Sequence, residues 1–314
     1  MKFKKLAMGI AILLSTTTFL ACGGDTTGKE DVKNPAFNVT ITDSSDYTVT
    51  IEKKPERIVS LSPSTTEIVA ALGAEAKLVG RTEYCSYPEE VQDATTVGGT
   101  STPSLEKIIE LKPDLVLAST HAPKEVVEKL RELKIPTIFL NEDDNFEGTY
   151  SAIEKTGQLI GEDAKAKEIV DSMKKTKTAV ETAVNKEFEG KERPSIYFTN
   201  SIGENGDFAA GGDTFISEVL ELAGGKNIAG DVEGWSYSKE KIVENDPDII
   251  IVPGGVGIKE DLVKLPVYKD LTAVKEGNVY EVNQDEISRQ GPRVVNALED
   301  IAIIISPELE YEKN

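Results

Sequence analysis

Apolar and polar residues alternate over residues 37–52, FNVTITDSSDYTVTIE, which is the pattern of a β-hairpin around the turn DSSD. From Arg57 onward, short apolar runs alternate with segments of helical periodicity: RIVSL, TTEIVAAL, LVG, SLEKIIEL, DLVLAS, PKEVVEKLREL and TIFL. Continuous apolar runs such as LVLA are typical of strands that are covered on both faces of a parallel sheet. The order predicts a doubly wound α/β lobe over residues 37–145.

Helical periodicity then continues over residues 146–190. The segment EDAKAKEIVDSMKKTKTAVETAVNKEF spans about 26 residues, enough for a helix of roughly 39 Å. Its apolar residues form one stripe: Ile169, Met173, Val180, Val184 and Phe188. Because a strand-loop-helix pattern restarts at Ser195, we interpret this segment as a connection with one bridging helix rather than as a bundle element within one lobe. A single helical crossing leads us to expect little closure on ligand binding.

Residues 191–314 predict a second α/β lobe, with strands SIYFTN, DIIIV and NVYEV and a last helix PRVVNALEDIAIII. The expected fold is therefore two doubly wound α/β lobes joined by one long bridging helix, with a ligand cleft between the lobes.

A thirteen-residue pattern occurs twice, as SLEKIIELKPDLV from Ser104 and as SKEKIVENDPDII from Ser238, 134 residues apart. Each copy predicts a Ser-capped helix with Glu106 or Glu240 in its first turn, ended by a proline and followed by a buried strand. We expect the apolar side chains of both helices to face a core: Leu105, Ile108, Ile109, Leu111, Ile242 and Val243.

The repeat predicts two lobes related by duplication, with a glutamate presented at the same place on each. Two matching acidic side chains suggest a partner with two matching sockets. For each glutamate, the alternative is a residue that only complements the helix dipole.

The first residues predict export. Lysines 2, 4 and 5 precede LAMGIAILLSTTTFL, which is the pattern of a signal peptide over residues 1–21 rather than of a membrane span. The sequence FLACGG resembles a bacterial lipobox, in which Cys22 becomes diacylated, although Phe19 replaces the usual aliphatic residue. Secretion without lipidation is the alternative. Residues 22–36 have the composition of a flexible tether, so we expect a protein anchored outside the cytoplasmic membrane, or in the periplasm where an outer membrane is present.

The composition disfavours several classes of function. A formal net charge of −20 disfavours nucleic acid as a partner and is compatible with a partner protein that has a basic surface. The alternative is that the acidic residues only confer solubility. The one histidine, His121, argues against zinc hydrolases and bare-metal cages. It remains a candidate axial ligand to iron or cobalt, or else an exposed loop histidine. Cys85 has no partner for a disulfide once Cys22 is assigned to lipidation.

Sequence signals for an enzyme are poor. GxSxG, HExxH and Walker motifs are absent from the sequence, and no convincing pair of nucleophile and base emerges. We therefore expect a binding protein with no intrinsic cofactor and no resident metal.

Candidate ligand contacts come from the loops that follow the strands, because α/β sheets bind ligands beyond the carboxyl ends of their strands. Aromatic and cationic side chains in such loops are not explained by a core face. They are Tyr84, Phe208, Trp235, Arg81 and Arg289. Each of them alone can also be structural, since a loop aromatic often packs on its own lobe.

Several blocks in order along the whole mature chain resemble the substrate-binding proteins of ABC importers for iron-siderophores, heme and cobalamin. After the lipobox and the hairpin they are PERIVSLSPSTTEIVAALG, VGRTEYCSYPEE, VGGTSTPSLEKIIELKPDLVLA, FAAGGDTFISEVLELAGG, WSYSKEKIVENDPDIIIV and RQGPRVVNALE. The resemblance implies the two-lobed fold, no catalysis, and a lipid-anchored monomer that delivers a metal chelate to an ABC permease dimer with its ATPase subunits. It also implies that Glu106 and Glu240 dock into arginine pockets, one on each permease copy.

Within this resemblance the cobalamin binders match best. Tyr84 and Phe208 correspond to aromatic positions that line their cleft, and Trp235 lies within one residue of a third. Thr100 and Ser119 stand where the best-known cobalamin binder has tryptophans, so the aromatic clamp is weaker or the ligand is different.

We expect a corrinoid ligand, with Thr100 among its contacts. The alternatives in the same class are heme and an iron chelate, often anionic, held by Arg81 and Arg289. Alternatives from other classes are a metal-cofactor scaffold on the same plan and an adhesion or signalling lipoprotein with an empty cleft.

Overall fold

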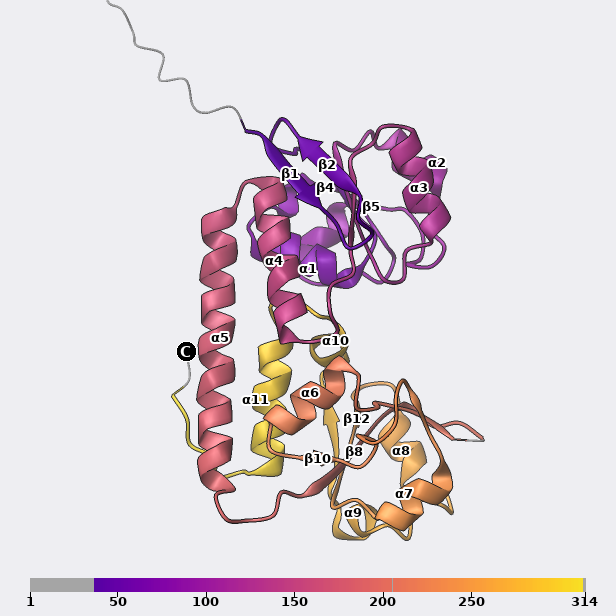
Figure 1. The fold of residues 1–314 in the computed structure, drawn as a ribbon. Helices are drawn as coiled ribbons and strands as arrows, with labels where there is room; N and C mark the ends of the chain where they lie inside the picture. The colour runs from indigo at the N-terminus through magenta and orange to yellow at the C-terminus, as the bar shows by residue number, and fades with distance from the viewer. Residues whose placement is uncertain (1–36, 205, 313–314) are drawn as a thin grey trace, which may run out of the picture. The chain divides into compact units, whose positions relative to one another are not determined.

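Two α/β lobes with a long helix beside them make up residues 37–204 and 206–312, the part of the chain that the computed structural model describes (Figure 1). The predicted signal peptide, the tether and Cys22 lie outside the described residues. Among the helices of the described part, none is both long enough and apolar enough to cross a membrane.

The N-terminal lobe is built on a parallel sheet of five strands in the order β5-β4-β3-β6-β7. They are β3 (Ile58–Ser60), β4 (Leu78–Arg81), β5 (Thr95–Thr96), β6 (Leu115–Ser119) and β7 (Thr137–Leu140). The helices are α1 (Pro63–Ala71), α2 (Leu105–Glu110) and α3 (Lys124–Glu132). Before the sheet, β1 (Val39–Thr42) and β2 (Thr48–Ile51) form the expected antiparallel hairpin. Every apolar residue of β6 is fully buried, as its continuous apolar run predicts.

The C-terminal lobe has a six-stranded sheet in the order β11-β9-β8-β12-β13, with β10 also paired to β8. The strands are β8 (Ser195–Ser201), β9 (Asp207–Ala209), β10 (Lys226–Asn227), β11 (Ser236–Tyr237), β12 (Ile249–Pro253) and β13 (Val279–Val282). The helices are α6 (Phe215–Leu222), α7 (Lys239–Asn245), α8 (Ile258–Leu262), α9 (Thr272–Glu276), α10 (Gln284–Ser288) and α11 (Val294–Ile305).

Two of these strands correct the sequence prediction. The segments that contain β9 and β11 were expected to be loops, but β9 runs antiparallel to β8 and β11 runs antiparallel to β9. Strands of three and two residues beside glycines carry too little periodicity to be recognised in a sequence.

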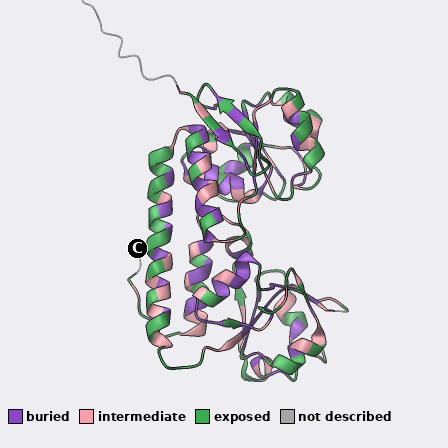
Figure 2. Ribbon diagram, viewed as in Figure 1, coloured by how far each residue is buried: buried purple, intermediate pink, exposed green. Residues whose placement is uncertain are grey.

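Two helices connect the lobes. Helix α4 (Phe146–Ile160) ends at Gly161, whose φ of 71° turns the chain into α5 (Asp163–Glu187). Helix α5 packs on α4 and also on α6 and α11 of the second lobe, with its outer side exposed (Figure 2). Met173, Val180 and Val184 of the predicted apolar stripe are buried. One hydrophobic cluster includes side chains of both lobes and of α5, so the bridging helix shares their core.

The predicted duplication is visible in the backbone. Strand β6 lies between β3 and β7, and β12 lies in the same way between β8 and β13. Helices α2 and α7 end near residues with a left-handed backbone, Lys112 (φ 47°) and Asp246 (φ 36°), which are 134 residues apart. Asp114 and Asp248, which are also 134 residues apart, accept hydrogen bonds from the backbone N–H groups of Arg57 and Ser195. Arg57 immediately precedes β3, and Ser195 is the first residue of β8. The two copies are therefore one structural unit repeated.

The exposure of α2 and α7 corrects one expectation. Ile108 and Ile242 are fully buried, but Ile109 is 38% exposed and Val243 is 52% exposed. Successive helical residues point about 100° apart, and a short helix that packs through a narrow face leaves the second residue of each pair outside the core.

Candidate functional site

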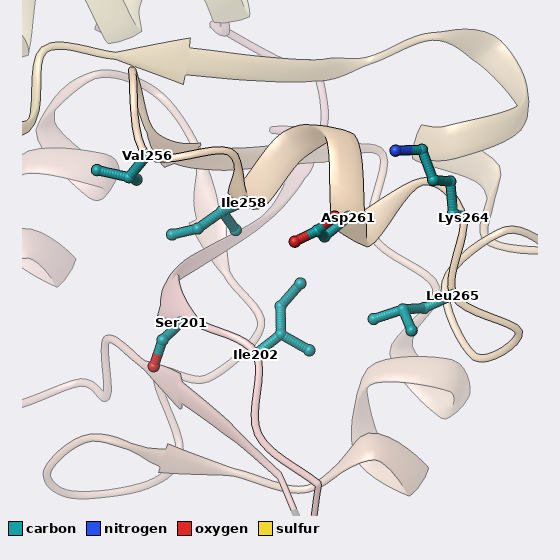
Figure 3. A pocket seen from close by; sticks show the side chains of 7 residues that line it. All are labelled: Ser201, Ile202, Val256, Ile258, Asp261, Lys264 and Leu265. Carbon is teal, nitrogen blue, oxygen red and sulfur yellow. The ribbon is translucent and has the colours of Figure 1, made fainter.

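Two cavities lie at the carboxyl ends of the C-terminal strands, the edge of an α/β sheet at which ligands bind. One of about 440 Å³ lies between the end of β8 and α8, with Ile202 across the cavity from the helix (Figure 3). Its lining residues are Ser201, Ile202, Val256, Ile258, Asp261, Lys264 and Leu265. The second, of about 540 Å³, adjoins the ends of β12 and β13 and is lined by Gly254, Glu281, Val282, Asn283, Gln284 and Asp285.

An aromatic surface stands on β9 and the chain before β11. The rings of Phe208 and Trp235 are stacked, with centroids 4.9 Å apart and planes 11° apart. Phe208 is 48% exposed, whereas Trp235 is partly buried against the core. Asp207 and Ala209 on either side of Phe208 are buried, so the strand alternation turns Phe208 outward. Phe208 thus offers a free ring face, and Trp235 supports it.

A buried carboxylate anchors this strand. Asp207 accepts hydrogen bonds from the hydroxyls of Tyr197 at 2.8 Å and Tyr268 at 2.6 Å. Burial raises the pKa of Asp207 above its ordinary value, and the two tyrosine hydroxyls offset part of that effect by stabilising the charged form. Because both tyrosines lie in the lobe core, these bonds fix the position of β9 beneath Phe208.

The N-terminal lobe contributes Tyr84, which follows β4 and is 57% exposed. A Cβ atom added at Gly99 would lie 3.6 Å from Cε2 of Tyr84, so the ring rests beside the loop that carries Thr100. That loop is closed by a bridge between Gly98 and Pro103, with Gly98 at φ 114°, a conformation that favours glycine. The structure therefore brings the predicted contacts Tyr84 and Thr100 into adjacent loops.

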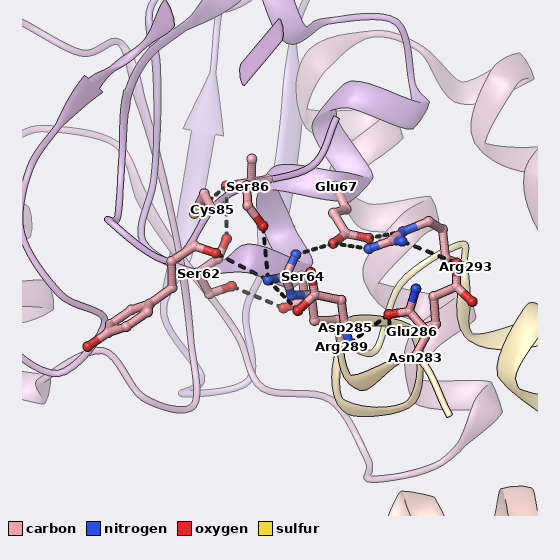
Figure 4. Close-up of polar contacts among 12 residues, drawn as sticks. Ser62, Ser64, Glu67, Cys85, Ser86, Asn283, Asp285, Glu286, Arg289 and Arg293 are labelled. Carbon is pink, nitrogen blue, oxygen red and sulfur yellow. Dashed lines mark hydrogen bonds and ion pairs between the residues drawn. The ribbon is translucent and has the colours of Figure 1, made fainter. Parts of the chain in front are cut away.

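Five charged side chains join the two lobes and are here called the interlobe ion cluster (Figure 4): Glu67, Asp285, Glu286, Arg289 and Arg293. The carboxylate of Glu67 on α1 accepts from Arg289 Nη1 at 2.7 Å and from Arg293 Nε and Nη2, both at 2.8 Å. Its side chain is only 3% exposed. The pairing holds α1 of the first lobe against α10 and α11 of the second.

The cluster changes the interpretation of Arg289. Its guanidinium was expected to meet an anionic ligand, but it pairs with Glu67 and with Asp285 at 2.7 Å and donates to the carbonyl of Tyr84 at 3.2 Å. The positive charge of Arg289, which was expected to meet a ligand, is thus paired with carboxylates of the protein itself. Sequence reasoning missed Glu67 and Arg293, although a glutamate inside the apolar helix TTEIVAAL is a signal for a buried charge that needs partners.

Arg81 differs from Arg289. Its Nη1 donates to the carbonyl of Thr82 at 3.0 Å and its Nη2 to the carbonyl of Gln92 at 3.4 Å, while its buried Nε has no hydrogen-bond partner. Among the described ion pairs none includes Arg81, so carbonyl dipoles rather than a carboxylate face its charge.

The remaining candidates, His121 and Cys85, lie in different environments. His121 is exposed in the loop after β6. The Cys85 thiol is 2% exposed and lies 3.1 Å from the hydroxyls of both Thr66 and Thr82. In the part of the chain that the structure describes, no group of three or more His, Cys, Asp or Glu side chains is placed to hold a metal ion.

Comparisons with known proteins agree with this architecture. The family model described as periplasmic binding protein matches residues 58–286. An uncharacterized ABC transporter substrate-binding lipoprotein of Bacillus subtilis is 35% identical over 313 residues, 97% of this chain and 98% of the relative. A cobalamin-binding protein of Halobacterium salinarum is 30% identical over 282 residues, 85% of this chain and 74% of the relative. A solved structure of a possible iron-binding protein from Staphylococcus epidermidis has 31% identity and a TM-score of 0.69, over 81% of this chain and all of that one.

Proposed function

The chain belongs to the periplasmic binding protein family and is a substrate-binding protein of an ABC importer, and we propose that its ligand is a corrinoid held at the carboxyl ends of its strands. The relatives are transport proteins rather than enzymes, and we propose that this chain likewise binds without catalysis. The lipoprotein relative supports an extracytoplasmic location, and lipidation at Cys22 is part of the proposal.

The exposed face of Phe208 is the observation that carries the corrinoid assignment. A corrinoid is a large metal chelate with broad, largely apolar ring faces and a rim of uncharged amides, which suit an aromatic platform. Phe208 supplies such a platform in one lobe, and the exposed Tyr84 supplies an aromatic side chain in the other. The binding of a cobalamin by the Halobacterium relative, as its name states, supports the same ligand class.

The charges around the cavities also favour an uncharged ligand. A catecholate chelate carries several negative charges and requires cations to replace its water. Arg289 is already paired with two carboxylates, and the cavity at the ends of β12 and β13 is lined by Glu281 and Asp285.

An anionic ferric siderophore is the second candidate, and Arg81 is the observation in its favour. This half-buried guanidinium contacts carbonyl oxygens but no carboxylate among the described ion pairs. An anionic chelate that reached Arg81 would gain a charge-assisted hydrogen bond.

Delivery to a permease dimer is proposed for Glu106 and Glu240. Both are exposed, and each lies in the first turn of one copy of the duplicated helix. Helices α2 and α7 lie on the side of the molecule away from α5 (Figure 1), so one partner can approach both lobes together. The repeat matches a partner with two equivalent subunits.

Fluorescence titration tests the ligand. Trp235 is the single tryptophan of the chain and is stacked on Phe208, so a chelate that covers Phe208 changes its emission. The lipoprotein in detergent is titrated separately with cyanocobalamin, heme, and a ferric catecholate and a ferric hydroxamate, with correction for ligand absorbance. We expect saturable quenching by cyanocobalamin. Quenching by a ferric siderophore alone would replace the corrinoid by a siderophore, quenching by heme alone would replace it by heme, and no response to any of the four would contradict a chelate ligand.

A further inference from the structure

Ile109 and Val243 are exposed apolar side chains at equivalent places on the two duplicated helices. The two residues are 134 positions apart, as are the glutamates, and each lies three residues after Glu106 or Glu240. Residues three apart are neighbours on the surface of a helix. Each copy of the repeat therefore presents a carboxylate and a branched apolar side chain side by side, here called a docking pair: Glu106 with Ile109, and Glu240 with Val243.

The orientation of both helices is fixed, so the exposure is a property of the fold. Ser104 Oγ accepts from Lys107 N and Ser238 Oγ accepts from Lys241 N, both at 3.3 Å, which sets the start of each helix alike. Ile108 and Ile242 anchor each helix through a fully buried side chain. A slight rotation does not hide Ile109 or Val243 without exposing these anchors.

Recurrence distinguishes this pair from other exposed apolar residues. Isolated apolar side chains on a surface are common and need no function. Among the exposed large apolar side chains of the described residues, Ile109 and Val243 are the two that are separated by the 134-residue offset of the repeat. Tyr84, Phe208 and Val256 instead belong to the loops and strands around the ligand site.

We propose that Ile109 and Val243 add an apolar contact to the docking proposed above for the glutamates, so that each of two equivalent sockets on the dimeric permease has an apolar part beside its cationic part. This inference rests on the proposed function, since it names the surface by which the importer recognises its binding protein. The carboxylates provide long-range attraction that salt screens. The apolar side chains act at contact, are insensitive to salt, and slow dissociation.

Binding kinetics at several salt concentrations test the two parts separately. The probe is a purified corrinoid permease with its ATPase subunits in nanodiscs, and the lipoprotein variants are measured by interferometry. Ile109→Ser and Val243→Ser should each raise Kd about fivefold, through faster dissociation, and together about twenty-five-fold. Their dependence on salt should equal that of the wild type. Glu106→Gln with Glu240→Gln should instead slow association and flatten the salt dependence.

Two controls separate docking from damage. Leu133→Ser removes an apolar side chain that is 48% exposed at the end of α3, outside the docking pairs, and should leave Kd unchanged. The melting temperature of each variant and its affinity for cyanocobalamin should equal those of the wild type, because the substituted side chains are exposed.

The outcomes distinguish this inference from the function on which it rests. If both serine variants bind the permease with the wild-type Kd while the glutamine variant binds more weakly, the apolar contact is overturned and the importer function still stands. No binding by the wild type, despite capture of cyanocobalamin, would overturn docking as a whole. Sedimentation that shows a dimer of the wild type and a monomer of the serine variants would assign the surface to a second copy of this chain, and so contradict the proposal.

Discussion

Phe208 and Trp235 contribute unequally to the aromatic surface, although both were predicted from their position after strands. Phe208 is 48% exposed and turned outward by the alternation of β9, whereas Trp235 is partly buried and packs behind it. A ligand that stacks on this surface removes water mainly from Phe208. Trp235 acts by holding the ring of Phe208 in place.

Phe208→Ala should therefore weaken ligand binding by roughly 1–3 kcal/mol, the range for losing a large aromatic contact. Phe208→Tyr keeps the ring and is the matched control, with an affinity close to that of the wild type. Calorimetric titration with cyanocobalamin measures both variants. Equal affinity of Phe208→Ala and the wild type would remove Phe208 from the ligand contacts.

The sequence located these aromatic residues but not the partners of the charged ones. Tyr84 and Phe208, predicted as ligand contacts from their places after strands, are both exposed in the structure, and local order along the chain was enough to expect them there. The pairing of Arg289 with Glu67 was not predicted, because Glu67 is 222 residues away and no local pattern reports such a pairing. Ile109 and Val243 were assigned to a core because six or seven helical residues contain too few turns to define the buried face.

At the scale of elements, the interlobe ion cluster is the main polar connection between α1 and the pair α10 and α11. Glu67 accepts hydrogen bonds from two arginines in a site from which water is nearly excluded. Removing one partner from such a site leaves the other charges buried and poorly compensated.

Glu67→Gln should lower the free energy of unfolding by about 3 kcal/mol, since both guanidinium groups lose their shared carboxylate. Urea denaturation followed by circular dichroism measures the change. Asp171→Asn is the control, because its pair with Lys167 on α5 is exposed and should contribute less than about 1 kcal/mol. Equal effects of the two substitutions would show that the cluster does not hold the lobes together.

Elements with a long apolar run were predictable, and short ones were not. Strands β6 and β12 have five residues each, begin with four consecutive apolar residues, and were found with their helices in both copies of the repeat. Strands β5, β9, β10 and β11 have two or three residues and depend on neighbouring strands for their definition. The hairpin that carries Phe208 was therefore missed, although Phe208 itself was identified.

In the described part of the molecule taken as a whole, the lobes are connected by more than a flexible linker. Helix α5 packs on helices of both lobes, and one hydrophobic cluster includes Ile153, Val180 and Leu298. The interlobe ion cluster adds a second connection beside the loop that carries Tyr84. Relative movement of the lobes must disturb both this core and the buried charges, which disfavours a wide hinge motion.

Ligand binding should therefore change the radius of gyration by less than about 1 Å, as in complexes formed by pre-organised partners. Small-angle X-ray scattering with and without saturating cyanocobalamin measures the difference. A larger contraction in the wild type would contradict the rigid connection. The Glu67→Gln variant serves as the comparison, and it should contract more because one of the two connections is weakened.

The duplicated helices have a consequence for how such a protein diversifies. The two lobes are alike at α2 and α7. They differ at one sheet edge, because β9 and β11 add antiparallel strands to the C-terminal sheet, whereas the N-terminal sheet of the described residues is wholly parallel. Substitutions around Phe208 alter this antiparallel edge and leave α2 and α7 unchanged. Under the docking proposed for Glu106 and Glu240, a lineage of such proteins can thus exchange one cargo for another and still be accepted by the same permease.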